Sequence, residues 1–249
     1  MELTQKSSIV DVDGCSLHYV TEGEGPPMIL LHGLGASLAT WQHNIDALAK
    51  FFSLYAFDLL GFGNSTPPPD FDYGLGRYAE TLYKAVCALK IDRAHLVGSS
   101  FGGAVAALFS LRYPEKVHRL IVIGAVGFRA IASLNENTSD PRPDGSPGGN
   151  GSHELSSETV LNVLQSIDEK ALEDLEKKTL LGRAVMIITG EHDPLIHREA
   201  VCSIIARNPL AKCLIIPDAH HLPHEDCPGL VNRNIISYCT QADSRSFCG

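Results

Sequence analysis

The sequence VGSSFGG at residues 97–103 decides the fold of this chain. It joins a short apolar run at residues 95–97 to a stretch with helical spacing that begins near residue 101. The pattern G-x-S-x-G at such a junction is typical of a strand that turns sharply into a helix, where small neighbours let a strained serine project above a sheet. We therefore expect Ser100 to be a nucleophile at the end of the fifth predicted strand.

Short apolar runs alternate with longer amphipathic stretches on both sides of this turn. Near-continuous apolar strands separated by helices are typical of a parallel sheet that is covered on both faces. Residues 8–21 instead predict an antiparallel hairpin that turns at Asp13 and Gly14. The expected fold class is therefore α/β, with a mostly parallel central sheet and helices on both faces. The predicted strands of the sheet are residues 28–31, 54–57, 95–97, 120–123, 185–189 and 213–216, and the predicted helices are residues 41–50, 78–90, 102–113, 198–207 and 230–238.

Groups that can activate Ser100 follow the last two predicted strands. A serine hydroxyl is a weak nucleophile at neutral pH, so it needs a base that is itself oriented by an acid. Asp193 follows one of these strands, and the loop after the other carries His220, His221 and His224. The chain order serine, aspartate, histidine is one of the orders in which this group of three occurs. The residues alone predict one acid and leave three histidines as candidate bases.

A glycine-rich turn, HGLG at residues 32–35, directly follows the strand predicted at residues 28–31. Acyl transfer needs hydrogen-bond donors aimed at the oxygen that becomes negatively charged, and backbone N–H groups held in such a turn can supply them. We expect the amides of Leu34 and Phe101 to form this oxyanion hole. His32 is expected to order the turn rather than to move protons.

The composition limits the partners of this chain. Its 249 residues are 44% hydrophobic and 20% charged, which suits one large domain, and its formal net charge is −9. The negative charge disfavours nucleic acid and anionic membranes as partners. The longest apolar run, residues 120–128, is shorter than the roughly 20 residues of a membrane helix, and residues 1–10 lack a signal-peptide core. We expect a cytoplasmic protein without a membrane span.

Neither a cofactor nor a metal is predicted. The seven cysteines never form a CxxC pair, and the eleven histidines include no H-E-x-x-H arrangement. The expected partner is a small-molecule ester substrate, and the sequence indicates no particular oligomeric state.

One region departs from the alternating pattern. Residues 135–154 contain no apolar residue other than proline and glycine, a composition that cannot bury a core and that predicts a flexible loop. Residues 156–181 then predict one or two amphipathic helices. We expect residues 129–182 to form a short cap or lid, inserted into a core made of residues 1–128 and 183–249.

Taken together, these motifs resemble the α/β-hydrolase fold superfamily over nearly the whole chain. The resemblance rests on HGLG at 32–35, DLLGFGNS at 58–65, GSSFGG at 98–103, GEHDPL at 190–195 and HLPHEDCP at 221–228. It implies a serine esterase or lipase with a short cap.

The resemblance also implies roles for individual residues. Ser100 is the nucleophile, Asp193 is the acid, and His221, which begins HLPHEDCP, is the base, with His220 as the alternative if the segment is shifted by one residue. Serine at the nucleophile position disfavours haloalkane dehalogenases and epoxide hydrolases, which resemble this superfamily but carry aspartate there.

The expected function is hydrolysis of carboxylic esters of small to medium size through an acyl-enzyme. The alternatives are a carbon–carbon bond hydrolase or a thioesterase of the same fold, and a ligand-binding protein in which the three residues are little used. Turnover of a simple ester distinguishes an enzyme from a binding protein.

Overall fold

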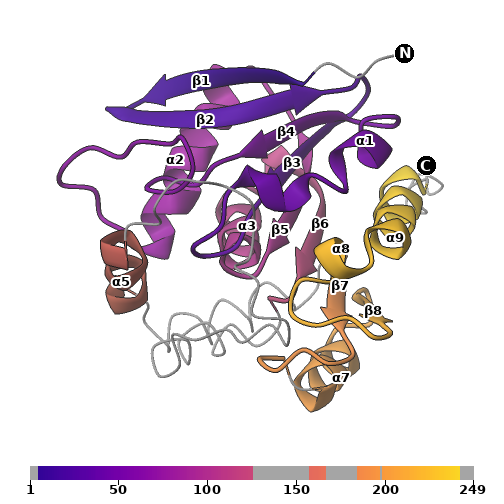
Figure 1. The fold of residues 1–249 in the computed structure, drawn as a ribbon. Helices are drawn as coiled ribbons and strands as arrows, with labels where there is room; N and C mark the ends of the chain where they lie inside the picture. The colour runs from indigo at the N-terminus through magenta and orange to yellow at the C-terminus, as the bar shows by residue number, and fades with distance from the viewer. Residues whose placement is uncertain (1–4, 126–156, 167–183, 197, 242–249) are drawn as a thin grey trace.

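A computed structural model describes residues 5–125, 157–166, 184–196 and 198–241. In this part of the chain, eight strands form one sheet in the order β1-β2-β4-β3-β5-β6-β7-β8 (Figure 1). Strand β2 pairs antiparallel with both β1 and β4, and all other neighbours are parallel. The strands are β1 (Lys6–Val12), β2 (Cys15–Glu22), β3 (Pro27–Leu31), β4 (Ser53–Phe57), β5 (Ala94–Ser99), β6 (Val117–Ile123), β7 (Val185–Gly190) and β8 (Lys212–Ile216).

The central strands are apolar on both faces because both faces of the sheet are covered. In β3, Ile29 and Leu31 pack into one hydrophobic cluster, called the first cluster below. Met28 and Leu30 pack into a second cluster on the opposite face. All four side chains are fully buried, and each such burial contributes about 1.5–3 kcal/mol to folding. The predicted class, a mostly parallel α/β sheet covered on both sides, is confirmed.

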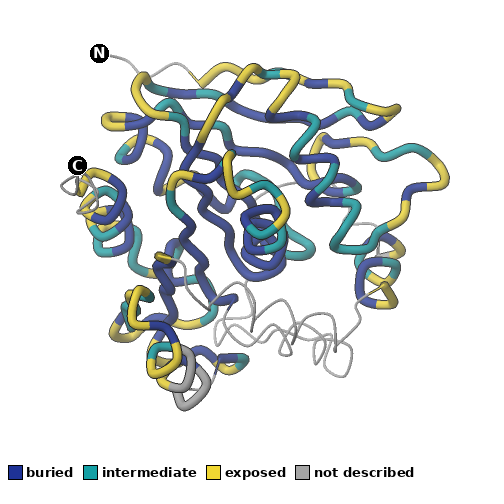
Figure 2. The backbone as a smooth tube through the Cα atoms, turned by 180° about the vertical axis from the view of Figure 1, so that it is seen from behind, coloured by how far each residue is buried: buried dark blue, intermediate teal, exposed yellow. Residues whose placement is uncertain are grey.

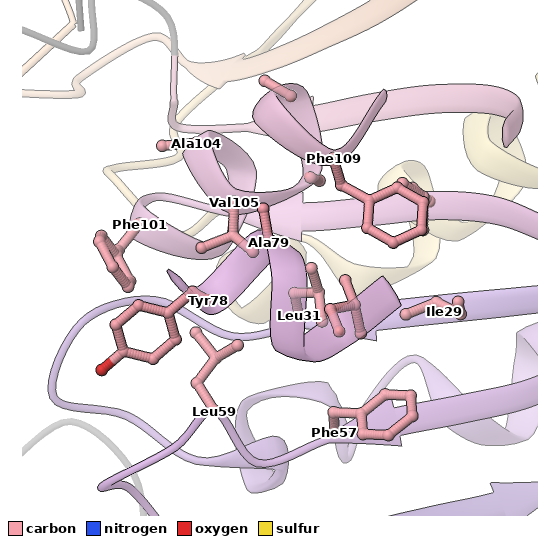
Figure 3. Packing of buried hydrophobic residues seen from close by; sticks show 14 of the residues in the cluster. Ile29, Leu31, Phe57, Leu59, Tyr78, Ala79, Phe101, Ala104, Val105 and Phe109 are labelled. Atoms are coloured by element: carbon pink, nitrogen blue, oxygen red, sulfur yellow. The ribbon is translucent and has the colours of Figure 1, made fainter. Parts of the chain in front are cut away.

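Helices form the two outer layers. Helices α2 (Leu75–Ala88) and α3 (Phe101–Arg112) contact each other and cover one face, where Tyr78 and Val105 pack near Leu31 (Figure 3). The first cluster also takes in residues of α5 (Ser157–Ser166) and α7 (Arg198–Arg207). The other face is covered by the 3₁₀ turn η1 (Leu38–Trp41), α1 (Ile45–Leu48) and α9 (Pro228–Thr240). The short elements η2 (Pro114–Lys116) and α8 (Pro223–Asp226) complete the described helices.

Burial is greatest in the centre of the molecule. Figure 2 shows the inner strands and the first turns of α3 in dark blue, whereas the outer strand β1 is largely exposed. Every residue of β5 and of β7 is buried. Residues placed at the ends of these two strands are therefore held by a rigid support.

The helix predicted at residues 41–50 is wrong in its extent. The structure has η1, then a break, then the four-residue helix α1. The cause is Asn44, which is fully buried and whose side-chain amide donates to the backbone oxygen of His224 at 3.2 Å and to Oδ1 of Asn232 at 2.7 Å. Asn44 directly precedes α1, and its φ of −113° departs from the usual helical value near −63°, at the point where the predicted helix is divided.

The predicted insertion is described only in part. A helix expected within residues 156–181 is present as α5, whose Val163 is fully buried in the first cluster. Residues 126–156 and 167–183 lie outside the described residues, and the flexible loop expected at 135–154 falls among them. The division into a core and a 129–182 cap stays a prediction. None of the described helices is long and apolar enough to cross a bilayer.

The hairpin turn yields a test of the fold. Asp13 and Gly14 both have positive φ, 49° and 75°, as expected for a two-residue hairpin turn. A Cβ on Gly14 would meet nothing within 4 Å, so Gly14→Ala introduces only backbone strain. We expect it to lower the free energy of unfolding by about 1 kcal/mol, measured by urea denaturation.

The control for this measurement is Gly229→Ala. Gly229 lies in the first turn of α9, is exposed, and also has open space around an added Cβ, without a positive φ. Alanine there should leave stability unchanged or raise it by up to about 1 kcal/mol. Equal losses in both variants would contradict the left-handed turn at Gly14.

Candidate active site

Ser100 stands at the turn from β5 into α3 in a strained conformation. Its φ is 49° and its ψ is −119°, a region that residues other than glycine rarely adopt. Its amide donates to the oxygen of Ile123 on β6 at 2.8 Å, and its carbonyl accepts from the amides of Gly103 and Ala104 on α3. The strain is held in place by hydrogen bonds on both sides of the turn.

Three glycines make this turn sterically possible. A Cβ on Gly98 would lie 2.3 Å from the oxygen of Gly102, and one on Gly102 would lie 2.4 Å from the oxygen of His32. A Cβ on Gly103 would lie 2.4 Å from that of Ala125. No real Cβ approaches so closely, so the backbones meet at distances that only glycine permits.

His221 lies between Ser100 and Asp193. Its Nε2 is 3.0 Å from Oγ of Ser100, and its Nδ1 is 3.1 Å from each carboxylate oxygen of Asp193. Asp193 can only accept when ionised, so Nδ1 carries the proton and Nε2 accepts from the serine hydroxyl. The imidazole is 22% exposed and the carboxylate is fully buried. The structure thus brings the three residues expected from the sequence into direct contact.

Asp193 is fixed by the chain that follows β7. Its Oδ1 accepts from the amides of Leu195 and Ile196 at 2.9 and 3.1 Å. These donors orient the carboxylate toward the imidazole and offset part of the cost of burying its charge.

Two glycines to which the sequence analysis assigned no role allow the loop of His221 to approach closely. A Cβ on Gly124 would lie 2.5 Å from the oxygen of His221 and 3.3 Å from its Nδ1, and one on Gly190 would lie 2.0 Å from the oxygen of His220. Gly124 also has a φ of +56°. The available signal was a glycine directly after each of two predicted strands, the position at which a neighbouring loop must approach closely.

His220 and His224 occupy different surroundings from His221. The side chain of His220 is 54% exposed, and its Nδ1 is 3.7 Å from Asp226. His224 is fully buried, with its ring centroid 4.4 Å from that of Trp41 and its Nε2 3.1 Å from Oγ1 of Thr40. Among these three histidines, His221 alone contacts both Ser100 and Asp193.

The turn at residues 32–35 lies beside Ser100. A Cβ on Gly33 would lie 3.2 Å from that of Ser100. His32 is fully buried, donates through Nδ1 to the oxygen of Gly33 at 2.7 Å, and accepts at Nε2 from the amide of Leu59 at 2.9 Å. Burial lowers the pKa of His32, so this imidazole is neutral and braces the turn.

The predicted oxyanion donors have suitable positions in the chain. Phe101 is the first residue of α3, and the first amides of a helix have no acceptor within it. Leu34 directly follows the glycine that adjoins Ser100. Their role as an oxyanion hole stays a prediction.

Helix α5 contacts the same region. A Cβ on Gly35 would lie 3.8 Å from Val160, and one on Gly61 would lie 2.7 Å from Cγ2 of Thr159. The hydroxyl of Ser166 donates to the oxygen of Tyr73 at 2.9 Å. This part of the predicted insertion therefore packs against the turn that carries Leu34.

A group of metal-ligating side chains lies next to the loops of Asp193 and His221. Within the described residues, ligand atoms of Glu191, His192 and Asp218 lie within 4.8 Å of one another, and all three residues are exposed. Exposed groups of this kind commonly occur without an ion. His221 contacts both Asp193 and Ser100 directly, without these side chains.

The sheet order, the strained serine and the histidine–aspartate pair after later strands define a hydrolase fold. The chain has the α/β-hydrolase fold, and residues 26–145 match the family model described as alpha/beta hydrolase fold. The resemblance found from the sequence is thus confirmed.

Two curated relatives match part of the chain. A 1-acylglycerol-3-phosphate O-acyltransferase, ABHD5 of Rattus norvegicus, is 40% identical over 105 residues, which cover 41% of this chain and 30% of that protein. A 2-hydroxy-6-oxo-2,4-heptadienoate hydrolase of Pseudomonas putida is 38% identical over 115 residues, which cover 45% and 41%. The chain therefore spans less than half the length of either relative.

Solved structures match nearly the whole chain. The carboxylesterase CesB of Bacillus subtilis superposes with a TM-score of 0.73 at 23% identity, over 97% of this chain and 94% of that one. A likeness at this level of identity shows the fold alone.

The burial of His224 predicts how stability depends on pH. Burial, and next the nearby His221, lowers the pKa of His224 from its ordinary 6.5 to about 3. Between pH 6.5 and pH 3 this imidazole is therefore protonated in the unfolded chain but neutral in the folded chain. The free energy of unfolding consequently falls as the pH falls toward 3. From pH 7 to pH 5 this residue should remove about 2 kcal/mol from the free energy of unfolding.

The measurement is urea denaturation at both pH values, with and without His224→Gln. The variant should be less stable at pH 7, because the ring leaves Trp41, but its loss between pH 7 and pH 5 should be smaller by about 2 kcal/mol. His220→Gln is the control, because that ring is half exposed, and it should keep the wild-type dependence. An unchanged pH dependence in His224→Gln would contradict the assignment.

Proposed function

We propose that the chain hydrolyses carboxylic esters through an acyl-enzyme on Ser100. The observation that carries the proposal is the unbroken hydrogen-bond path from Oγ of Ser100 to Nε2 of His221 at 3.0 Å, and from Nδ1 of His221 to Asp193 at 3.1 Å. This path is what a serine needs in order to act as a nucleophile at neutral pH.

In the first half of the reaction, Oγ of Ser100 attacks the acyl carbon while its proton moves to Nε2 of His221. The carbonyl oxygen becomes an oxyanion, which the amides of Leu34 and Phe101 would stabilise. The tetrahedral intermediate then collapses, the ester C–O bond breaks, and His221 returns the proton to the departing alcohol. The acyl group remains on Ser100.

In the second half, water replaces the alcohol. His221 takes a proton from the water as it attacks the acyl carbon, and it returns that proton to Oγ of Ser100 as the acid leaves. The imidazole is positively charged at each tetrahedral intermediate, and the buried carboxylate of Asp193 faces it at 3.1 Å. The carboxylate is fully buried, so it stabilises this charge more strongly than a carboxylate in solvent would.

Other outcomes of the same chemistry remain candidates. The Pseudomonas putida relative is named a 2-hydroxy-6-oxo-2,4-heptadienoate hydrolase, and carbon–carbon bond hydrolases are among the homologues, which favours a carbon–carbon bond hydrolase as the second candidate. The rat relative is named an acyltransferase, and an acyl-enzyme can pass its acyl group to an alcohol instead of water. A thioesterase and a ligand-binding protein with a little-used triad are the further alternatives.

The first test is Ser100→Ala, assayed with p-nitrophenyl acetate and butyrate. Removing the nucleophile should lower kcat/KM by about three orders of magnitude or more, because the path from base to substrate ends at Oγ. Ser99→Ala is the matched control: Ser99 is the adjacent, fully buried serine, and its loss should leave most of the activity. Full esterase activity in Ser100→Ala would reject the proposal.

The same proteins separate the alternatives by substrate. A panel of p-nitrophenyl esters, an acyl thioester and a 2-hydroxy-6-oxo-2,4-dienoate would rank the reactions by kcat/KM. The proposal predicts that the esters rank first. Absence of turnover on the whole panel, with ligand binding retained, would support the binding protein instead.

The second test compares the histidines. His221→Ala should lower kcat/KM by about three orders of magnitude, because the members of such an array act as a unit, while His220→Ala should keep most of the activity. Asp193→Asn should be strongly impaired yet folded, because the amide keeps the shape but favours the other imidazole tautomer. Loss of activity in His220→Ala with retention in His221→Ala would assign the base one residue earlier.

A further inference from the structure

A second serine–histidine–aspartate array lies outside the site of Ser100. Oγ of Ser7 on β1 is 2.8 Å from Nε2 of His18 on β2, and Nδ1 of His18 is 2.8 Å from Oδ2 of Asp58, which follows β4. These distances are shorter than those of the Ser100 array. Three strands lie between β1 and β5 in the sheet, so the strands that carry the two serines are about 19 Å apart at ordinary strand spacing.

The roles of the atoms in this array are fixed by Asp58. Its Oδ1 accepts from the amide of Leu38 at 2.7 Å, and its Oδ2 accepts from the amide of Asn64 at 2.9 Å as well as from His18. A carboxylate that receives these donors holds the proton of the imidazole on Nδ1. Nε2 of His18 is then an acceptor, and the hydroxyl of Ser7 donates to it.

Exposure differs sharply along the array. Asp58 is 1% exposed and His18 is 7% exposed, whereas Ser7 lies on the solvent side of the outermost strand. In the hairpin, His18 is paired with Ile9, so Ser7 reaches the imidazole diagonally on the same face. The only member that an external reagent can approach freely is the hydroxyl.

We propose that Ser7 is a second acylation site, which accepts acyl groups from activated esters independently of Ser100. In this step Oγ of Ser7 forms a bond to the acyl carbon, its proton moves to Nε2 of His18, and the bond to the leaving group breaks. The proton then passes from His18 to the departing phenolate or solvent, which leaves Ser7 as an ester and His18 neutral. No other reactant is required.

The burial of His18 determines what happens to the acyl group. Hydrolysis would need a water molecule at Nε2, and the side chain of His18 is 9% exposed, against 22% for that of His221. The ester on Ser7 is therefore long-lived. This makes Ser7 a site of modification, in contrast to a turnover site.

The test uses the Ser100→Ala protein, so that the first site cannot contribute. Treated with p-nitrophenyl acetate, it should release about one equivalent of p-nitrophenolate and gain one acetyl group on Ser7 by peptide mapping. Hydroxylamine should remove this group, which separates a serine ester from an acetylated lysine such as Lys6. The result should be the same whether or not Ser100 proves to be the catalytic serine.

The controls distinguish an activated serine from any exposed hydroxyl. Ser7→Ala in the Ser100→Ala background should abolish the hydroxylamine-sensitive acetyl group, and Ser8→Ala, on the opposite face of the same strand, should not. His18→Gln, checked for folding by circular dichroism, should slow acylation of Ser7 by about 100-fold. Acetylation of Ser7 no faster than that of Ser8, or at an unchanged rate in folded His18→Gln, would overturn the proposal.

Discussion

The positive φ of Ser100 constrains everything around it. A side chain at φ 49° can be held only if strand β5, helix α3 and the turn after β3 meet backbone to backbone, which Gly98, Gly102 and Gly103 permit. That packing in turn requires β5 to lie centrally in the sheet, buried on both faces, with β3 and β6 beside it. The position of one hydroxyl at the carboxyl end of β5 thus depends on the close-packed core beneath it.

Two buried carboxylates are oriented by hydrogen bonds from backbone amides. The carboxylate of Asp193 is fully buried and accepts hydrogen bonds from two backbone amides. These bonds fix its orientation in place of water molecules. Asp58 is held in the same way by the amides of Leu38 and Asn64. In both places a buried carboxylate fixes an imidazole tautomer, and in both a serine hydroxyl is hydrogen-bonded to Nε2 of that imidazole. The same arrangement of three side chains therefore occurs at two places on one sheet.

The parts that sequence reasoning predicted are those with local signals. The parallel strands follow from apolar runs, and Ser100 follows from its glycine-flanked turn. Asn44, Gly124 and the Ser7 array were not anticipated, because each depends on a contact between distant segments. Asn44 meets Asn232 across 188 residues of chain, and Ser7 and Asp58 meet only through His18. A single polar residue in an ordinary position carries no periodicity, so its partner appears only once the sheet order is known.

The parallel pairing of β6 with β7 determines the course of the chain that connects them. Strand β6 ends at Ile123, whereas β7 begins at Val185, which is paired with Leu120. The connection must therefore return from the carboxyl end of one strand toward the amino end of the next, and the part of it in α5 contacts the turn at residues 32–35. The free energy of closing such a connection changes only logarithmically with its length. Insertions and deletions between these two strands are therefore tolerated more readily than changes within β5, every residue of which is buried.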